Sequence, residues 1–189
     1  VNACIYFLPM LDGKEVVTVE SLGNPRDLHP VQTAMAEGNG TQCGFCTPGF
    51  VMSLFARYQD TDPALPSDTD DVLAGNLCRC TGYAPIQKAA EAVNDSAAYK
   101  ARFGGPRTIE ALKSIQPASA ISTHYDDPNF ETDRQYFAPQ TEAGLIELLK
   151  ATPSATMVAG ATDVGLWVTK QHRLLDTVIS LSRCLFGMQ

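Results

Sequence analysis

Residues 42–49 read QCGFCTPG and residues 75–82 read GNLCRCTG, and together they hold four of the chain's six cysteines. Cys43 and Cys46 form a C-x2-C pair, and Cys78 and Cys80 form a C-x-C pair. Tight cysteine pairs in a chain that opens without a secretion signal favour a metal over disulfides. Gly44 supplies the backbone freedom for the bend between the first two thiolates. The sequence therefore predicts a metal or iron–sulfur site held by these four cysteines.

Spacing alone leaves other interpretations of the four cysteines open. Four thiolates can hold either zinc or an iron–sulfur cluster. Zinc sites usually combine two C-x2–4-C knuckles on small β-ribbons, whereas here one pair is C-x-C and the surrounding pattern is helical. Four buried structural thiols and a redox-active dithiol are two further interpretations. A non-enzymatic helical adaptor, stabilised by zinc and without a redox role, therefore stays open beside an electron-transfer protein.

The acidic composition argues against two classes of partner. The formal net charge is −7, and such a surface repels phosphate backbones and anionic lipid headgroups. We therefore expect no nucleic-acid partner and no membrane partner. No apolar run reaches the roughly 20 residues that a transmembrane helix needs. At 44% hydrophobic and 19% charged residues, the composition is typical of a globular protein.

The middle of the chain has the apolar spacing of helices. Four helices are predicted: one from Pro30 to just before Gly38, one capped by Thr47 and ending before Asp60, one over residues 67–74, and one that follows Pro85. The order helix, cysteine pair, helix occurs twice, which would place both pairs at helix N-termini, facing each other. N–H groups at a helix N-terminus lower thiolate pKa values and hydrogen-bond a negatively charged cluster.

The regions on either side of these helices have different patterns. Residues 3–8 and 15–19 read as two short β-strands, which cannot bury a core alone and so indicate the end of a larger domain. Residues 99–138 contain several Gly and Pro and little periodicity, and are predicted to be a linker. The last part predicts a helix over 143–151, a strand over 155–159, a helix over 163–170 and a strand over 177–181. This order is typical of the opening of an α/β domain.

HPVQ at residues 29–32, followed by the two cysteine stretches, resembles the molybdenum hydroxylases, or xanthine oxidase family. The resemblance is strong over residues 25–95. It implies a four-helix bundle around one [2Fe–2S] cluster, the relay nearest molybdenum, whose ligands would be Cys43, Cys46, Cys78 and Cys80. It also implies that Gln42 and Cys80 contact the molybdopterin.

The first residues extend this resemblance. Residues 2–4 read NAC and look like the strand that carries the fourth ligand of the family's plant-type [2Fe–2S] ferredoxin domain. The resemblance implies that Cys4 is a ligand of a second cluster in the intact protein. Its three partner cysteines would lie upstream of the present chain.

Residues 157–165 read MVAGATDVG and look like the family's strand–loop–helix that binds the pyrophosphate of FAD. A glycine turn and a helix N-terminus present N–H groups to phosphate oxygens. Spacing alone would favour an ordinary strand-to-helix turn, because neither G-x-G-x-x-G nor a Walker loop is present. Ala161 stands where many family members have Gly or Asn. The residues implied for FAD are Val158, Ala159, Gly160, Ala161, Thr162, Asp163 and Val164.

The sequence thus predicts an α+β, multidomain fragment in which the four-helix bundle has a domain piece on either side. The predicted segments are the end of a ferredoxin-like β domain over 1–22, the helical [2Fe–2S]-binding domain over 23–98, a linker over 99–138, and the start of an α/β-type FAD-binding domain over 139–189. This order resembles the xanthine dehydrogenase type, whose small subunit joins iron–sulfur and FAD domains. The aldehyde and carbon monoxide dehydrogenase types are alternatives.

The resemblance implies an electron-transfer role in a cytoplasmic oxidoreductase. Hypoxanthine or xanthine would be hydroxylated at the molybdopterin of a large partner subunit, and electrons would pass through [2Fe–2S] clusters to FAD and then NAD. The implied assembly is a heterotetramer of two small and two large subunits, with a single fused chain, as in the eukaryotic-type members, as the alternative. No catalytic residue is expected in this chain. His29, His124 and His172 are expected to be surface or capping residues, and Cys184 has no assigned role.

Overall fold

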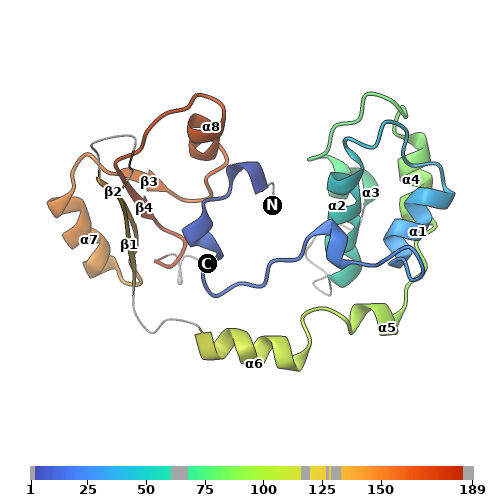
Figure 1. Cartoon of the computed structure of the whole chain (residues 1–189), viewed down its shortest axis with the longest axis horizontal. Helices are drawn as coiled ribbons and strands as arrows, with labels where there is room; N and C mark the ends of the chain where they lie inside the picture. Colours follow the sequence, from blue (N-terminus) through green and yellow to red (C-terminus); the bar gives the residue numbers. More distant parts are fainter. Residues whose placement is uncertain (1–2, 61–67, 116–119, 127, 129–132, 185–189) are drawn as a thin grey trace. The chain divides into compact units, whose positions relative to one another are not determined.

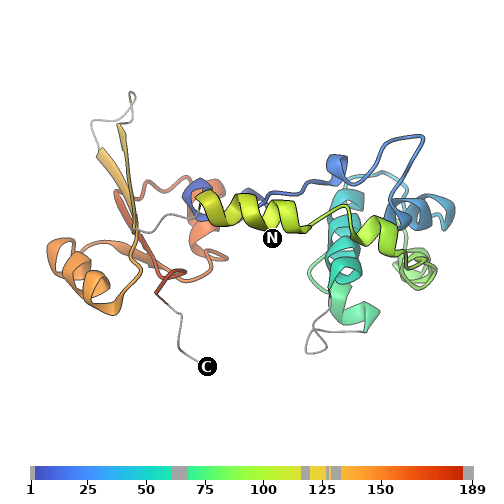
Figure 2. The ribbon, with the colours of Figure 1, turned by 90° about the horizontal axis from the view of Figure 1, so that it is seen from below.

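The computed structural model describes residues 3–60, 68–115, 120–126, 128 and 133–184. It forms two compact units, drawn in Figures 1 and 2: unit 1 comprises Val1–Glu15 and Ala111–Gln189, and unit 2 comprises Val16–Glu110. The described residues contain both helices and a sheet, so the α+β class is confirmed. In this part of the chain, no helix combines the length and the apolar character needed to cross a bilayer.

Unit 2 is helical and contains both cysteine stretches. The predicted helices are present as α1 (Pro30–Glu37), α2 (Thr47–Gln59), α3 (Thr69–Leu73) and α4 (Ala84–Glu91), and a short α5 (Ala97–Lys100) follows. Helix α1 contacts α2 and α4, and α3 contacts the same two helices. Apolar residues at helical spacing build their shared core, with Phe50 and Ile86 fully buried. The cysteine loops therefore begin and end on helices that one core holds together.

The start of α2 differs from the prediction in one detail. The N-cap residue is Cys46, and Thr47 is the first residue of the helix. The Thr47 hydroxyl does not cap the helix but is hydrogen-bonded to the Thr41 hydroxyl at 2.6 Å. The Cys46 side chain makes no capping hydrogen bond either, so its thiol has no part in holding the helix end.

His29 is the buried cap of α1. Its Nδ1 accepts a hydrogen bond from the Val31 N–H at 3.3 Å, and the Gln32 side chain accepts one from the His29 N–H at 3.0 Å. The ring is fully buried and packs edge-on against the rings of Phe55, Tyr58, Tyr99 and Phe103. The capping expectation is confirmed for His29, while His124 and His172 are exposed.

We expect unit 2 to lose stability as the pH falls below about 6.5, the ordinary pKa of histidine. Burial, followed by the nearby charge of Arg102, lowers the pKa of His29, so the folded state keeps the ring neutral. The unfolded chain takes up the proton first. Stability is then lost from about pH 6.5 down to the folded pKa, by at most about 1.4 kcal/mol per pH unit. Urea unfolding at a series of pH values measures the slope.

His29→Phe is the matched control, because it keeps a ring in the site but has no proton to bind. The other ionisable side chains around the His29 ring belong to Tyr58, Tyr99, Arg102 and, through Tyr99, Asp27. Hydrogen bonds from Tyr99 and Arg102 lower the pKa of Asp27, so this carboxyl stays ionised over the pH range in which His29 is expected to act. Equal slopes in the wild-type and His29→Phe chains would contradict the expectation.

Unit 1 is built on a four-stranded sheet in the order β1-β2-β4-β3. Its strands are β1 (Ile121–Asp126), β2 (Asp133–Ala138), β3 (Thr156–Val158) and β4 (Thr177–Ser180). Strand β1 is antiparallel to β2, whereas β4 lies between β2 and β3 and is parallel to both. Helix α7 (Glu142–Ala151) joins β2 to β3, and α8 (Val164–Thr169) joins β3 to β4; Figure 1 shows the two helices on opposite sides of the sheet. The helix and strand order predicted after residue 139 is confirmed.

The two β-strands predicted near the start of the chain are wrong. Residues 3–20 contain no strand and instead form short 3-10 helices, η1 (Ala3–Ile5), η2 (Leu8–Leu11) and the beginning of η3 (Val19–Ser21). A strand needs a partner for its N–H and C=O groups, and the sequence pattern did not show whether one is present. Pro9 also suits the first turn of a helix, where it lies in η2.

The predicted linker over residues 99–138 has more regular structure than expected. It contains α6 (Pro106–Ile115) and the strands β1 and β2. Two of the prolines that suggested a linker mark the ends of elements: Pro106 begins α6 and Pro139 directly follows β2. The predicted helix over residues 67–74 corresponds to α3, although residue 67 lies outside the described residues.

Candidate metal centre

Two loops of unit 2 carry the four predicted ligands. Cys43 and Cys46 directly precede α2, and Cys78 and Cys80 lie between α3 and α4. Gly44 has φ of +84°, a left-handed conformation that glycine adopts without steric cost. This bend lets the backbone turn between the first two cysteines, as the sequence predicted.

The four thiols interact in two pairs, each with one cysteine from each loop. The thiols of Cys43 and Cys80 shift each other's pKa, and those of Cys46 and Cys78 do the same. Cys43 and Cys80 are exposed, whereas Cys46 is half-buried and Cys78 is buried. One pair therefore faces solvent and the other lies against the core of unit 2.

Local hydrogen bonds favour a thiolate at one member of each pair. A backbone N–H of its own loop, and then the Cys80 thiol, lower the pKa of Cys43. The hydroxyl and the N–H of Thr81 lower the pKa of Cys78 to about 7. The pKa of Cys80 is raised by the Cys43 thiol, and that of Cys46 is raised mainly by burial. Thiolates are the form of cysteine that binds metals. The lowered pKa values of Cys43 and Cys78 therefore favour the binding of a cationic centre.

This donor set fits a two-iron cluster. Four cysteine thiolates complete the coordination of a [2Fe–2S] cluster, and two thiol pairs supply one pair for each iron. No group of three or more His, Cys, Asp or Glu side chains placed to hold a metal ion is found in the described ranges, so the fit rests on the chemistry of the four thiols. The residues present are thus compatible with the cluster that the sequence predicted.

The seven residues predicted for FAD lie on β3, the following loop and the start of α8. Val158 and Ala161 are buried, Val164 is half-buried, and the others are exposed: Ala159, Gly160, Thr162 and Asp163. The Gly165 N–H donates to the Ala161 C=O at 2.7 Å, where the chain turns into the helix. The loop follows the carboxyl end of a parallel strand, the edge at which α/β sheets bind ligands. The individual FAD-binding residues remain a prediction.

Comparison with known proteins identifies both regions. The family model described as "[2Fe-2S] binding domain" matches residues 18–91. The model described as "FAD binding domain in molybdopterin dehydrogenase" matches residues 128–186. This chain belongs to the molybdenum hydroxylase family. Its match to both models within one chain supports an oxidoreductase with a [2Fe–2S] region and an FAD-binding region.

Curated relatives include two functional classes of molybdenum hydroxylase. Xanthine dehydrogenase 1 of Arabidopsis thaliana is 46% identical over 233 residues, which cover 97% of this chain and 17% of the relative. Xanthine dehydrogenase of Drosophila subobscura is 32% identical over 213 residues, covering 95% and 16%. Aldehyde oxidase 3 of Rattus norvegicus is 32% identical over 217 residues, covering 97% and 16%. The chain therefore spans a small part of the length of these relatives.

The other predicted site residues of this molybdenum hydroxylase chain lie in different places. Gln42 is exposed and directly precedes Cys43 in the same loop. Cys4 is exposed on η1, in unit 1, whereas the four paired thiols belong to unit 2. The Cys184 thiol donates a hydrogen bond to the Pro139 C=O at 2.8 Å, which gives this cysteine a local structural contact.

Two residues that contact the thiol site were not predicted. The Thr81 hydroxyl lies 3.2 Å from Cys78 Sγ, and the Tyr83 hydroxyl accepts a hydrogen bond from the Cys78 N–H at 3.0 Å. Both residues lie in the stretch that carries the family resemblance. Threonine and tyrosine are not the metal ligands that a sequence search looks for, so neither residue was singled out. Their position just after the C-x-C pair was the one sequence feature that could have indicated a contact with the thiols.

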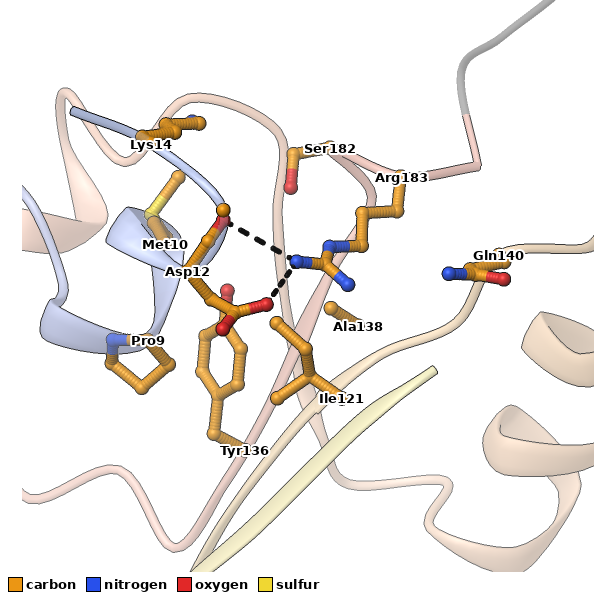
Figure 3. Close-up of a pocket in the computed structure, with 11 residues that line it drawn as sticks. Pro9, Met10, Asp12, Lys14, Ile121, Tyr136, Ala138, Gln140, Ser182 and Arg183 are labelled. Carbon is orange, nitrogen blue, oxygen red and sulfur yellow. Dashed lines mark hydrogen bonds and ion pairs between the residues drawn. The ribbon is translucent and has the colours of Figure 1, made fainter. Parts of the chain in front are cut away.

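Unit 1 has a separate cavity of about 510 Å³ at the carboxyl ends of β2 and β4. Figure 3 shows Arg183 facing Asp12 across it, with the guanidinium donating to both the carboxylate and the backbone C=O of Asp12. This pair neutralises the two charges inside the cavity. The described residues that line it include none of residues 158–164, so the cavity adds no support to the predicted FAD loop.

Ala161→Val is expected to destabilise unit 1 by about 2 kcal/mol. Ala161 is buried and has φ of +66°, a conformation in which a β-branched side chain is strongly strained. Ala159→Val is the matched control, because Ala159 is exposed and lies outside the left-handed region. Thermal unfolding of the two variants measures the difference. Equal melting temperatures would contradict the expected strain.

Proposed function

We propose that this chain is the electron-transfer part of a molybdenum hydroxylase of the xanthine dehydrogenase type. The observation that carries the proposal is the pairing of Cys43 with Cys80 and of Cys46 with Cys78 across two loops. Each pair would hold one iron of a [2Fe–2S] cluster, and α1 to α4 would form the bundle around it. When bound, the cluster supplies a carrier that takes up and releases one electron at a time.

The residues of unit 2 have three tasks in this proposal. The four cysteines hold the cluster, and the core beneath Cys78 shields one side of it from water. Backbone N–H groups of both loops donate to thiolate sulfur, which stabilises negative charge on the centre. Cys43 and Cys80 are exposed, so electrons would enter at this pair.

Gln42 and Cys80 are proposed to contact the molybdopterin of a partner. Both are exposed and lie on the two cysteine loops, which is compatible with a contact between that face and another molecule. A ligand sulfur at such a contact gives electrons a short route to the cluster. We further propose that Cys4 is a ligand of a second [2Fe–2S] cluster in the intact protein.

The electrons would continue to FAD and then to NAD. The proposed FAD contacts are the residues from Val158 to Val164, with the exposed backbone of the loop donating to the pyrophosphate. The proposed partner is a large molybdopterin-binding subunit, in a cytoplasmic assembly of two small and two large subunits. Hydroxylation of hypoxanthine or xanthine would take place in that partner.

Aldehyde oxidation is the second candidate function, because a relative named aldehyde oxidase covers 97% of this chain at 32% identity. Substrate-reduced EPR on the complete enzyme decides between the two. We expect anaerobic xanthine to produce the signal of reduced [2Fe–2S] clusters within the turnover time, and an aldehyde to produce little. A signal with the aldehyde alone would replace the purine assignment. The absence of a cluster signal with either substrate and with dithionite would reject the electron-transfer function.

A further inference from the structure

The backbone after Cys80 folds back toward Cys78. Gly82 and Tyr83 are consecutive residues with φ of +68° and +70°. For tyrosine this conformation is uncommon and costs backbone strain. The turn brings the phenol of Tyr83 to the Cys78 N–H, which donates to it at 3.0 Å. The strained conformation of Tyr83 therefore comes with a hydrogen bond to Cys78, which is one of the four proposed ligands.

The same turn places the Thr81 hydroxyl beside the Cys78 sulfur. Thr81 Oγ1 lies 3.2 Å from Cys78 Sγ, and the Thr81 N–H donates to that sulfur at 3.4 Å. The Tyr83 N–H donates to Thr81 Oγ1 at 3.1 Å. A thiolate bound to iron carries no proton, so the hydroxyl must be the donor in its contact with Cys78. The result is a chain of donors from Tyr83 N–H to Thr81 O–H to Cys78 sulfur, in which each hydrogen bond strengthens the next.

The other cysteine loop lacks this arrangement. Thr47 directly follows Cys46 as Thr81 follows Cys80, but the Thr47 hydroxyl is hydrogen-bonded to the Thr41 hydroxyl at 2.6 Å. Two threonines in matching sequence positions therefore make different contacts. If threonine were needed after a ligand only for the fold of the loop, both threonines would serve equally. Of these two hydroxyls, only that of Thr81 contacts a ligand sulfur, so an effect on the cluster is expected from Thr81 and not from Thr47.

We propose that Thr81 is a positioning residue that raises the reduction potential of the cluster by donating a hydrogen bond from its hydroxyl to Cys78 sulfur. This inference rests on the proposed function, since it requires a [2Fe–2S] cluster on the four cysteines. Reduction adds one electron to the cluster, and the hydrogen bond stabilises the more negative reduced state. No proton leaves Thr81 in this step. Tyr83 acts through Thr81, because its N–H orients the hydroxyl toward the sulfur.

The test is an EPR-monitored redox titration of the full chain and of Thr81→Val, Thr81→Ser and Thr47→Val, each with its iron and sulfide content measured. We expect Thr81→Val to keep its cluster and to have a midpoint potential more negative than that of the wild type. Thr81→Ser should restore the wild-type potential, because it keeps the hydroxyl. Thr47→Val should leave the potential unchanged.

A wild-type potential in Thr81→Val, an equal shift in Thr47→Val, or no rescue in Thr81→Ser would overturn the proposal. Should Thr81→Val lose iron, Thr81→Ala removes the same hydroxyl with a smaller side chain and is titrated in its place. Loss of iron from both variants would assign Thr81 a structural role and also overturn the proposal. A wild-type chain without iron and sulfide would instead reject the proposed function, so the two failures are distinguishable.

Discussion

The Cys78→Ala chain is expected to be purified without its cluster, with iron and acid-labile sulfide falling from about two each per chain to nearly zero. Cys78 is buried, and its sulfur accepts hydrogen bonds from the hydroxyl and the N–H of Thr81. Removing it leaves its paired thiol, Cys46, as the sole cysteine ligand of one iron. The visible absorption of the chain and its EPR signal after dithionite should disappear together.

Cys4→Ala and Cys184→Ala are the matched controls for this loss. Both remove a cysteine, but neither belongs to the four paired thiols of unit 2. Each should keep the iron and sulfide content of the wild type. Full iron content in Cys78→Ala, or loss of iron in either control, would show that the ligand set is wrong.

Phe50→Ala is expected to lower the free energy of unfolding of unit 2 by about 3–5 kcal/mol. Phe50 is fully buried in the core shared by the helices and contacts the Tyr83 ring edge-on. Its removal leaves a cavity on the side of the core next to the second cysteine loop. Urea unfolding followed by helical circular dichroism measures the loss of stability.

Phe45→Ala is the control, since Phe45 lies between Cys43 and Cys46 but is 94% exposed. It should change the free energy of unfolding by less than about 0.5 kcal/mol. Because the two substitutions delete the same side chain, the comparison isolates the effect of burial. Equal losses in the two variants would contradict the described core.

The helices and the cysteine site could be predicted because local signals determine them. Pro30, Pro48 and Pro85 lie in the first turns of α1, α2 and α4, where proline is favoured. Apolar residues at helical spacing then identify the buried face of each helix. The cysteine spacing identified the four thiols but not which thiol from one loop pairs with which from the other.

The segments on either side of the helical region were harder to predict, because contacts with distant parts of the chain determine their secondary structure. Residues 3–8 have a β-like composition, yet part of this segment packs against α8, with the Ile5 backbone close to Gly165. The strands β1 and β2 lie in a stretch with several Gly and Pro, in which Pro106 and Pro139 mark the ends of elements. Neither arrangement is encoded in a local pattern.

Backbone conformations of single residues also escaped prediction. Tyr83 and Ala161 have positive φ. Non-glycine residues rarely adopt this conformation, so the residue type alone does not predict it. Ala161 gave a partial signal, because it stands where many family members have Gly or Asn, the residues that tolerate this conformation. The hydrogen bonds from Thr81 and to Tyr83 depend on the same turn and could not be foreseen.

Metal and acid-labile sulfide analysis of the anaerobically purified chain, with EPR after dithionite reduction, tests the central claim most directly. The account predicts about two irons and about two sulfides per chain, a reddish-brown colour and a spin-half signal. One zinc per chain, with no sulfide, no colour and no signal, would contradict it and would favour a zinc-stabilised helical adaptor.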